Sequence, residues 1–309
     1  MMPNTATPRI HLGPNPDAAL TRGIERGGGT LVPLDEAEAV VWAQGPDTFP
    51  GQLPDSVRWV QLPSAGVEPW ISEGIVDSER VWTSAAGAYA GNVAEHALLL
   101  LLAGVRSLPG QVLATSWRKT EFDPQVGTLR GATVAIVGCG GIGRAMIPLL
   151  AAFEARTLAV TRSGTPVPGA YETLAADRTT EIWSRADHFV IAAPATSETA
   201  HLVDASALAQ MKSTAWIVNV ARGSLIDTEG LVSALRAGAI GGAALDVTDP
   251  EPLPDGHPLW TLPNAIVTPH VANPATGLTR LLADHVATNV ERFAAGAPLV
   301  APIDPARGY

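Results

Sequence analysis

A glycine-rich stretch near the middle of the chain constrains the fold more than any other feature. Residues 133–137 are an apolar, β-branched run, and a Gly-x-Gly-x-x-Gly pattern and a helix-forming segment (145–153) follow it directly. In such a turn Gly138 permits the tight bend, Gly140 lets the backbone approach a pyrophosphate, and Gly143 lets the helix pack closely on the strand. The unpaired N–H groups at the start of the helix favour phosphate. The pattern therefore predicts a dinucleotide site, and its alternative is an ordinary strand–helix turn.

Short apolar runs alternate with helical segments on both sides of this stretch, which predicts parallel sheets covered by helices. We expect an α/β fold with two doubly wound parallel-sheet domains. One is a Rossmann cofactor domain at residues 91–283, and the other is a smaller, flavodoxin-like substrate domain. The expected strands are residues 9–12, 30–32, 39–42, 57–62 and 80–83 in the smaller domain, and 133–137, 157–160, 187–192, 215–220, 243–247 and 265–268 in the larger one.

The composition excludes several classes of partner. A net charge of −10 argues against nucleic acid or an anionic membrane as the main partner. Cys139 is the single cysteine, so no intramolecular disulfide can form, and its place in the glycine turn indicates a small packing residue. No spacing of His or Cys typical of metal ligands occurs, so we predict no metal. Residues 1–9 lack the apolar core of a signal peptide and the most apolar run is too short to span a bilayer, so we expect a cytoplasmic protein.

The residues after the second strand of the cofactor domain bear on the choice of dinucleotide. In this fold an acidic residue about 20 positions after the glycines binds the ribose 2′-OH and repels a 2′-phosphate. Thr161, Arg162 and Ser163 stand there instead, and two hydroxyls with a guanidinium suit a phosphate dianion. The sequence thus favours NADP over NAD, although Arg162 considered alone has the simpler interpretation of a surface arginine.

Three polar residues follow other strands of the same domain. Arg222 comes directly after one strand, and an arginine there can clamp a carboxylate and polarise an adjacent carbonyl. Glu251 lies between two prolines after the next strand, and His270 ends the strand after that. A carboxylate beside an imidazole raises its pKa and selects its tautomer, which produces a proton donor. By contrast, His96 lies in the apolar helix 93–106, and we expect it to be a structural group of the core or of an interface.

On these residues the chain resembles the D-isomer-specific 2-hydroxyacid dehydrogenases, in particular glyoxylate/hydroxypyruvate reductases. The resemblance runs from about Val57 to Pro302, and its motifs occur in the family's order. They are Ser64-Ala65-Gly66-Val67, Val93-Ala94-Glu95-His96-Ala97, Val137-Gly138-Cys139-Gly140-Gly141-Ile142-Gly143, Ala193-Pro194-Ala195-Thr196-Ser197-Glu198-Thr199, Asn219-Val220-Ala221-Arg222-Gly223, Asp246-Val247, Glu251-Pro252-Leu253-Pro254 and Thr268-Pro269-His270.

The resemblance implies roles for the matching residues. Arg222 would bind the substrate carboxylate and carbonyl, His270 would protonate the carbonyl oxygen, and Glu251 would support His270. Backbone N–H groups of Ala65 and Gly66 would bind the substrate carboxylate. The implied cofactor contacts beyond the glycines are Gly141, Ile142, Ala193, Pro194, Thr199, the Val220 carbonyl and Asp246, which would hold the nicotinamide carboxamide. The resemblance also implies that residues 1–90 and 284–309 together form the substrate domain and that the chain forms a homodimer through its cofactor domains.

Three positions depart from the family pattern. Thr161 replaces the ribose-binding acid, Thr248 stands where the family often has Phe, and Asn273 stands where Gly is frequent. We expect NAD(P)H-dependent reduction of a small 2-keto acid of the glyoxylate or hydroxypyruvate type to a D-2-hydroxy acid. Two alternatives stay open: a phosphoglycerate dehydrogenase, and a dinucleotide-sensing protein that resembles the C-terminal-binding corepressors. The end of the chain at Tyr309, without an appended regulatory domain, counts against the first.

Overall fold

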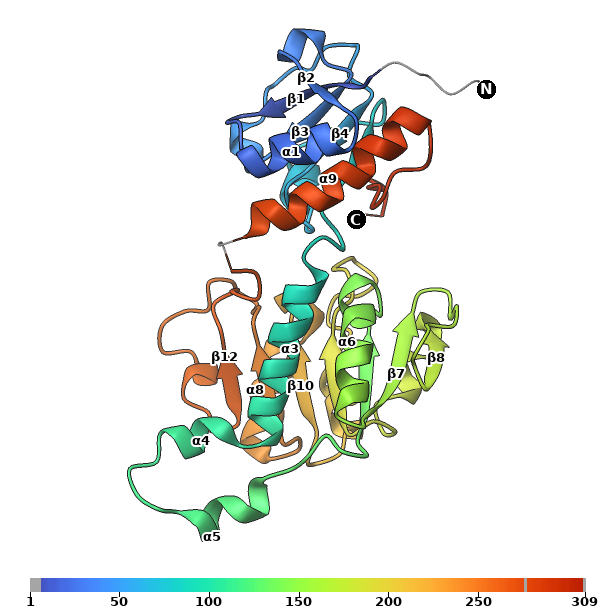
Figure 1. Cartoon of the computed structure of the whole chain (residues 1–309). Coiled ribbons are helices and arrows are strands. Elements are labelled where there is room, and N and C mark those ends of the chain that lie inside the picture. The colour runs from blue at the N-terminus through green and yellow to red at the C-terminus, as the bar shows by residue number, and fades with distance from the viewer. Residues whose placement is uncertain (1–6, 275–276, 308–309) are drawn as a thin grey trace. The chain divides into compact units, whose positions relative to one another are not determined.

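The computed structural model describes residues 7–274 and 277–307, which form two compact units. The first unit contains the described residues up to Tyr89 and from Pro274 onward, and the second runs from Ala90 to Asn273. Residues 277–283 therefore group with the first unit, whereas the sequence predicted them in the second. The reason is close packing, since helix α9 (Leu278–Ala295) lies alongside helix α1 (Ala18–Arg26) (Figure 1), and a Cβ on Gly23 would be 2.6 Å from the carbonyl oxygen of Ala283.

The first unit is built on a five-stranded parallel sheet with the order β2-β1-β3-β4-β5, which is the flavodoxin order. Asp17 caps helix α1 by accepting hydrogen bonds from the N–H groups of Ala19 and Leu20 at 2.8 and 3.0 Å. The strands are β1 (Arg9–Gly13), β2 (Thr30–Leu31), β3 (Ala39–Trp42), β4 (Trp59–Gln61) and β5 (Val81–Thr83), and the helices are α1 (Ala18–Arg26), α2 (Glu68–Ser72) and α9 (Leu278–Ala295).

The second unit is built on a seven-stranded parallel sheet with the order β12-β11-β10-β9-β6-β7-β8. The chain order reverses beside β6, where β7 lies on one side and β9 on the other, and ligands of open α/β sheets bind at such a point. The strands are β6 (Thr133–Val137), β7 (Arg156–Thr161), β8 (Glu172–Ala175), β9 (His188–Ile191), β10 (Trp216–Asn219), β11 (Gly242–Leu245) and β12 (Ala265–Val267).

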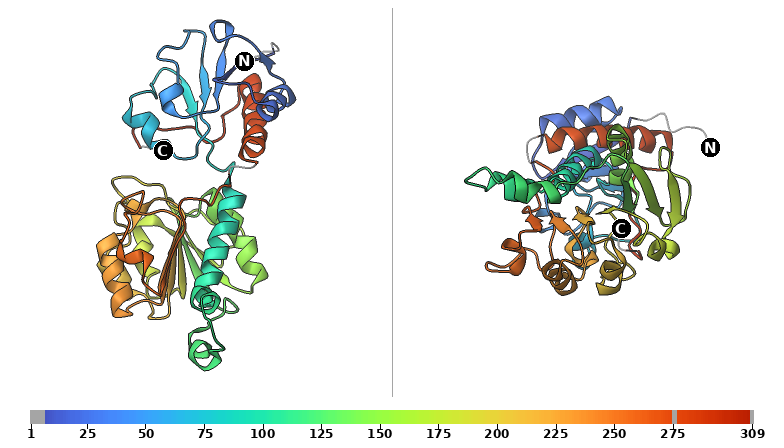
Figure 2. Two further views of the ribbon diagram at one scale, coloured as in Figure 1. Left: turned by 90° about the vertical axis from the view of Figure 1, so that its left-hand side faces the viewer. Right: turned by 90° about the horizontal axis from the view of Figure 1, so that it is seen from below.

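Helices cover both faces of this sheet. Alternate strand residues point to opposite faces. Val134 and Ile136 therefore pack with the buried side chains of α3 (Ala90–Val105) and α6 (Gly141–Ala152), whereas Ala135 and Val137 pack with those of α7 (Ala205–Gln210) and α8 (Thr228–Ala237). Figure 2 shows α3 and α6 on one side of the sheet and α8 on the other. The helices are α3 (Ala90–Val105), α4 (Leu108–Val112), α5 (Lys119–Phe122), α6 (Gly141–Ala152), α7 (Ala205–Gln210) and α8 (Thr228–Ala237).

The expected fold class is confirmed, with one correction to the larger sheet. The sequence analysis expected six strands in this unit, and the structure adds a seventh, β8, which pairs in parallel with β7. This strand was missed because it is a four-residue edge strand with only Leu174 fully buried. Of the described residues, no helix combines the length and apolar character that crossing a membrane requires.

Candidate active site

The glycine turn connects β6 to α6 with the geometry expected of a phosphate-binding loop. Gly138 has a φ of +86°, and a Cβ there would lie 2.3 Å from the Cα of Ala193. A Cβ on Gly143 would lie 2.8 Å from Sγ of Cys139, so this glycine allows close packing of the helix. A Cβ on Gly140, in contrast, would meet nothing within 4 Å. Cys139 is buried, and burial raises the pKa of its thiol, which suits packing and not nucleophilic chemistry.

The space at Gly140 fits a dinucleotide pyrophosphate. Gly140 is the N-cap of α6, so a side chain there would extend into the space in front of the helix. Gly141, Ile142 and Gly143 form the first turn, and their N–H groups have no earlier helical carbonyl to bind. These donors and the positive end of the helix dipole favour an anion at this position. The residues present therefore agree with the predicted cofactor site.

The segment after β7 contains polar groups that also fit a cofactor. The strand ends at Thr161, whose Oγ1 is buried and has no hydrogen-bond partner among the residues that the structure describes. Arg162 and Ser163 are exposed, and Oγ of Ser163 lies 2.7 Å from Oγ1 of Thr165. A buried hydroxyl without a partner is costly, so its presence here marks a place where an added polar ligand could supply the missing contact.

The loop after β9 lies against the glycine turn. Ala193 is the residue that a side chain on Gly138 would strike. Thr199 closes this loop, because its Oγ1 donates to the carbonyl of Pro194 at 2.7 Å and accepts from the N–H of Thr196 at 2.9 Å. The structure thus gives the Thr199 hydroxyl a role in shaping the loop, while the cofactor contacts of Ala193, Pro194 and Thr199 stay predictions.

Arg222 is presented by a turn that a buried asparagine organises. Asn219, the last residue of β10, is 1% exposed. Its Nδ2 donates to the carbonyl of Arg222 at 2.8 Å, and its Oδ1 accepts from the N–H of Ala221 at 3.0 Å. Nη1 of Arg222 donates to the carbonyl of Ala221 at 2.7 Å. Asn219 is a positioning residue that the sequence analysis quoted without a role, although a buried polar residue at the end of an apolar strand was the available signal.

His270 and Glu251 form a hydrogen-bonded pair at the same edge of the sheet. Nδ1 of His270 lies 2.6 Å from Oε1 of Glu251, and both side chains are about half exposed. The N–H of Thr248 donates to the other carboxylate oxygen of Glu251 at 3.4 Å. Because a carboxylate only accepts, the shared proton is bound to Nδ1 of the imidazole. Nε2 is then the ring nitrogen that can exchange a proton with a ligand.

The backbone of His270 is held in a strained conformation by Asp246. His270 has a φ of +54°, in the left-handed region that costs a side-chain-bearing residue about 1–2 kcal/mol. Its N–H donates to the carbonyl oxygen of Asp246 at 2.8 Å. The Asp246 carboxylate, 1% exposed, accepts from the N–H groups of Val271 and Ala272 at 2.9 and 3.0 Å. Asp246 therefore fixes the loop that carries His270, and its implied contact with a nicotinamide carboxamide stays a prediction.

Two predicted substrate-binding residues lie on the first unit, in the loop after β4. Ser64 Oγ donates to the carbonyl of Gly66 at 2.7 Å, and the hydroxyl of Tyr89 donates to the carbonyl of Pro63 at 2.8 Å. Within residues 7–274 and 277–307, no group accepts a hydrogen bond from the N–H of Ala65 or Gly66. These donors are therefore compatible with the predicted binding of a carboxylate.

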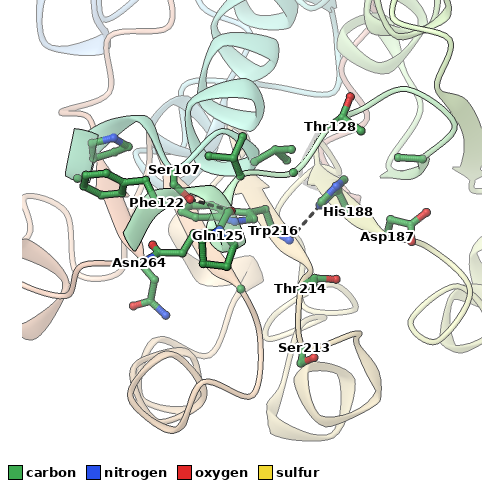
Figure 3. Close-up of a pocket in the computed structure, with 18 of the residues that line it drawn as sticks. Ser107, Phe122, Gln125, Thr128, Asp187, His188, Ser213, Thr214, Trp216 and Asn264 are labelled. Carbon is green, nitrogen blue, oxygen red and sulfur yellow. Dashed lines mark hydrogen bonds between the residues drawn. The ribbon is translucent and has the colours of Figure 1, made fainter. Parts of the chain in front are cut away.

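A large cavity of the second unit lies at the opposite edge of the sheet from this chemistry. It has a volume of about 1030 Å³ and lies between residues that begin strands and the segment that carries α4 and α5 (Figure 3). His188 faces it, and Nδ1 of this residue accepts a hydrogen bond from the N–H of Trp216 at 3.2 Å. Burial lowers the pKa of His188 to about 4, so the ring is neutral at physiological pH. In the described residues, no cluster of His, Cys, Asp and Glu that could hold a metal is present.

Comparisons with known proteins bear on the family and the fold of this chain. The family model described as "D-isomer specific 2-hydroxyacid dehydrogenase, NAD binding domain" matches residues 96–272. A glycerate dehydrogenase of Methylorubrum extorquens is 31% identical over 260 residues, which cover 80% of this chain and 79% of that protein. A glyoxylate reductase of Thermofilum pendens is 35% identical over 218 residues, 67% of this chain and 63% of that protein.

The fold also matches a solved structure over nearly its whole length. A D-isomer specific 2-hydroxyacid dehydrogenase of Xanthobacter autotrophicus, solved in complex with NADPH and MES, superimposes with a TM-score of 0.83. The two sequences are 26% identical, and the match covers 98% of this chain and 100% of the other.

Proposed function

The chain belongs to the D-isomer specific 2-hydroxyacid dehydrogenase family, and from that premise we propose that it uses NADPH to reduce a short 2-keto acid, such as glyoxylate or hydroxypyruvate, to the D-2-hydroxy acid. The observation that carries the proposal is the 2.6 Å contact between His270 and Glu251 on loops at the same sheet edge as the glycine turn. The names of the glycerate dehydrogenase and glyoxylate reductase relatives support this substrate class.

In the proposed mechanism three side chains bind the substrate or take part in the transfer of a proton to it. A bound nicotinamide dinucleotide supplies the hydride that reduces the carbonyl carbon. His270 donates the proton on Nε2 to the carbonyl oxygen, while Glu251 holds the ring through Nδ1. Arg222 pairs with the substrate carboxylate and stabilises negative charge on the carbonyl oxygen. Ala65 and Gly66 are proposed as further donors to the carboxylate.

A substrate panel tests this function directly. Purified protein with NADPH or NADH is mixed with glyoxylate, hydroxypyruvate, phosphohydroxypyruvate and longer 2-keto acids, and absorbance at 340 nm is followed. We expect the fastest consumption with a short unphosphorylated keto acid. Preferred turnover of phosphohydroxypyruvate would instead identify a phosphoglycerate dehydrogenase. Tight dinucleotide binding without turnover of any keto acid would refute the enzyme and favour a dinucleotide-sensing protein.

The cofactor preference is proposed to depend on Arg162. The exposed Arg162 and Ser163 and the unpartnered Oγ1 of Thr161 support NADP, and no carboxylate occupies the end of β7. We expect Arg162→Ala to raise the KM for NADPH roughly tenfold or more, because a charge-assisted hydrogen bond to phosphate is lost. The KM for NADH should change by less than about twofold, since NADH lacks that phosphate. Steady-state kinetics with both cofactors measure the difference.

A matched control accompanies this variant. Arg236 is an exposed arginine in the last turn of α8, and Arg236→Ala removes the same charge elsewhere on the unit. It should leave both KM values unchanged. Equal effects of Arg162→Ala on NADPH and NADH would contradict the proposed preference for NADP.

We also propose a homodimer, for which the segment after α3 is the best-supported contact. It carries large apolar side chains at high exposure: Val112 at 70%, Leu113 at 81% and Trp117 at 92%. Apolar groups gathered in this way mark interaction sites, and a second copy is the partner that the family resemblance implies. Figure 1 shows α4 and α5 beyond the end of α3, away from the body of the sheet.

Sedimentation velocity should find a dimer for the wild-type protein and a larger monomer fraction for Trp117→Glu, because a charge at a buried apolar contact is costly. Tyr171→Glu is the control, since Tyr171 is 67% exposed in a different part of the unit. A monomeric wild-type protein at micromolar concentration, or equal effects of the two substitutions, would contradict the proposed interface.

A further inference from the structure

A histidine of helix α3 contacts the two side chains that hold the His270 loop. His96 is in the second turn of α3, and its side chain is 15% exposed. Its Nε2 lies 3.2 Å from Oδ1 of Asp246 and 3.1 Å from Oγ1 of Thr268. Thr268 donates its hydroxyl hydrogen to Oδ1 of Asp246 at 2.6 Å, so its Oγ1 can only accept from Nε2 of His96, which therefore carries a hydrogen. The hydrogen bonds thus run from His96 through Thr268 to Asp246, with Nε2 also close to Oδ1.

This network surrounds a carboxylate that is almost fully buried. Asp246 is 2% exposed, and a buried charge is tolerated only when it is paired and hydrogen-bonded. In the part of the chain that the structure describes, His96 is the basic side chain paired with it. The other contacts of the carboxylate go to the hydroxyl of Thr268, which precedes His270, and to the N–H groups of Val271 and Ala272, which follow it.

The same contacts maintain the strained backbone at His270. A residue with a side chain adopts a left-handed φ stably only where the surrounding structure enforces it. Here the carbonyl of Asp246 receives the N–H of His270, and its carboxylate receives the next two N–H groups. If Asp246 rotates about its side-chain torsions, these last two hydrogen bonds break and the loop can relax. The position of the imidazole therefore depends on what keeps the Asp246 carboxylate in place.

We propose that His96 is a positioning residue for the proton donor, acting through Asp246 and Thr268 to keep the loop 268–272 in the conformation that aims His270. This inference rests on the proposed function, because it takes His270 as the proton donor. It assigns a role in turnover to a residue that the sequence pattern alone marked as structural. The simpler alternative is that His96 only stabilises the folded protein, in which case turnover per folded molecule would not depend on it.

Four substitutions separate these alternatives. His96→Leu removes the donor at similar volume, and His96→Gln places an amide N–H near the position of Nε2. Thr268→Val removes the hydroxyl, and Thr268→Ser keeps it. We expect His96→Leu and Thr268→Val to lower kcat by roughly 10- to 100-fold, because misplacement of a catalytic group by about 1 Å has effects of that size. KM for cofactor and keto acid should stay within about twofold, and His96→Gln and Thr268→Ser should keep most of the wild-type kcat.

A second measurement does not depend on turnover. Hydrogen–deuterium exchange of the peptide that contains residues 268–274 reports the hydrogen bonds of Val271 and Ala272 to Asp246. His96→Leu should make this peptide exchange faster while the strand peptide 133–137 keeps its wild-type rate. Wild-type kcat and wild-type exchange in His96→Leu would overturn the inference, as would a kcat for His96→Gln no better than that for His96→Leu.

The two measurements also distinguish failure of this inference from failure of the proposed function. If the wild-type protein reduces no keto acid, the proposed function fails. Faster exchange at residues 268–274 in His96→Leu would still support the loop-holding role in that case. Unchanged exchange would overturn it regardless of activity.

Discussion

Replacement of His270 by alanine should lower kcat for keto-acid reduction by roughly 10²–10⁴-fold, the contribution that general acid catalysis makes in enzymes. The expectation follows from the pairing of Nδ1 with Glu251 at 2.6 Å, which leaves Nε2 as the nitrogen that can deliver the proton. Water can replace the lost acid only in part, so residual turnover should be measurable. Stopped-flow or steady-state absorbance at 340 nm gives the rate, and NADPH affinity should stay near the wild-type value.

The left-handed backbone at this position requires a matched variant. Asparagine tolerates a positive φ better than alanine does, so His270→Asn removes the imidazole with less added strain at φ +54°. Both variants should lose similar activity if the imidazole itself is responsible. Near-normal kcat in His270→Asn would exclude His270 as the proton donor, and a large loss in alanine alone would point to the loop conformation.

Substitution of Arg222 has the second largest expected effect, a fall in kcat/KM of roughly 10²–10³-fold for Arg222→Gln. The magnitude is that of losing a donor that stabilises developing negative charge on an oxygen. Arg222→Lys should recover little, because a lysine cannot reproduce the two parallel hydrogen bonds of a guanidinium to a carboxylate. Both KM for the keto acid and kcat should change, since the same group is proposed to bind the carboxylate and the reacting carbonyl.

The control variant for Arg222 changes a residue of the same turn, Asn219. Asn219→Asp keeps the side-chain size but removes the Nδ2 donor to the carbonyl of Arg222. It should lower kcat/KM less than Arg222→Gln does, since the guanidinium remains present but is less well oriented. If Arg222→Lys retained wild-type kcat/KM, the role of Arg222 as a carboxylate clamp would be contradicted.

The glycine turn and the strand pattern were sufficient to predict the fold class. Short, continuous apolar runs indicate strands that are buried on both faces, as β6 and β9 are. Gly138 and Gly143 occur where a side chain would collide with Ala193 or Cys139. Strand β8 escaped prediction because its residues Glu172 to Ala175 carry little apolar signal, and only its pairing with β7 makes it a strand. The bounds of α3 also differed, since the sequence predicted a helix over 93–106 and the structure forms it over Ala90–Val105.

The candidate site was predictable as far as it follows from strand order. Arg222, Glu251 and His270 each come after a strand of one parallel sheet, so the sequence alone places them at the same edge. The structure adds the 2.6 Å contact between Glu251 and His270. This contact identifies Nδ1 as the paired ring nitrogen and leaves Nε2 as the nitrogen that can exchange a proton. Their catalytic roles stay predictions until the variants are measured.

The sequence by itself determined the two parallel sheets, the glycine turn and the polar residues that follow the strands, because each of these depends on short-range sequence pattern and on chain direction. Only the tertiary structure decided how these residues are held. His96 and Thr268 are 172 positions apart, and nothing in the local pattern distinguishes a histidine buried among leucines from one hydrogen-bonded to a threonine beside a carboxylate. The packing of α3 on the sheet brings His96 to Asp246, and the need of a buried charge for partners turns that contact into the proposed support of the His270 loop.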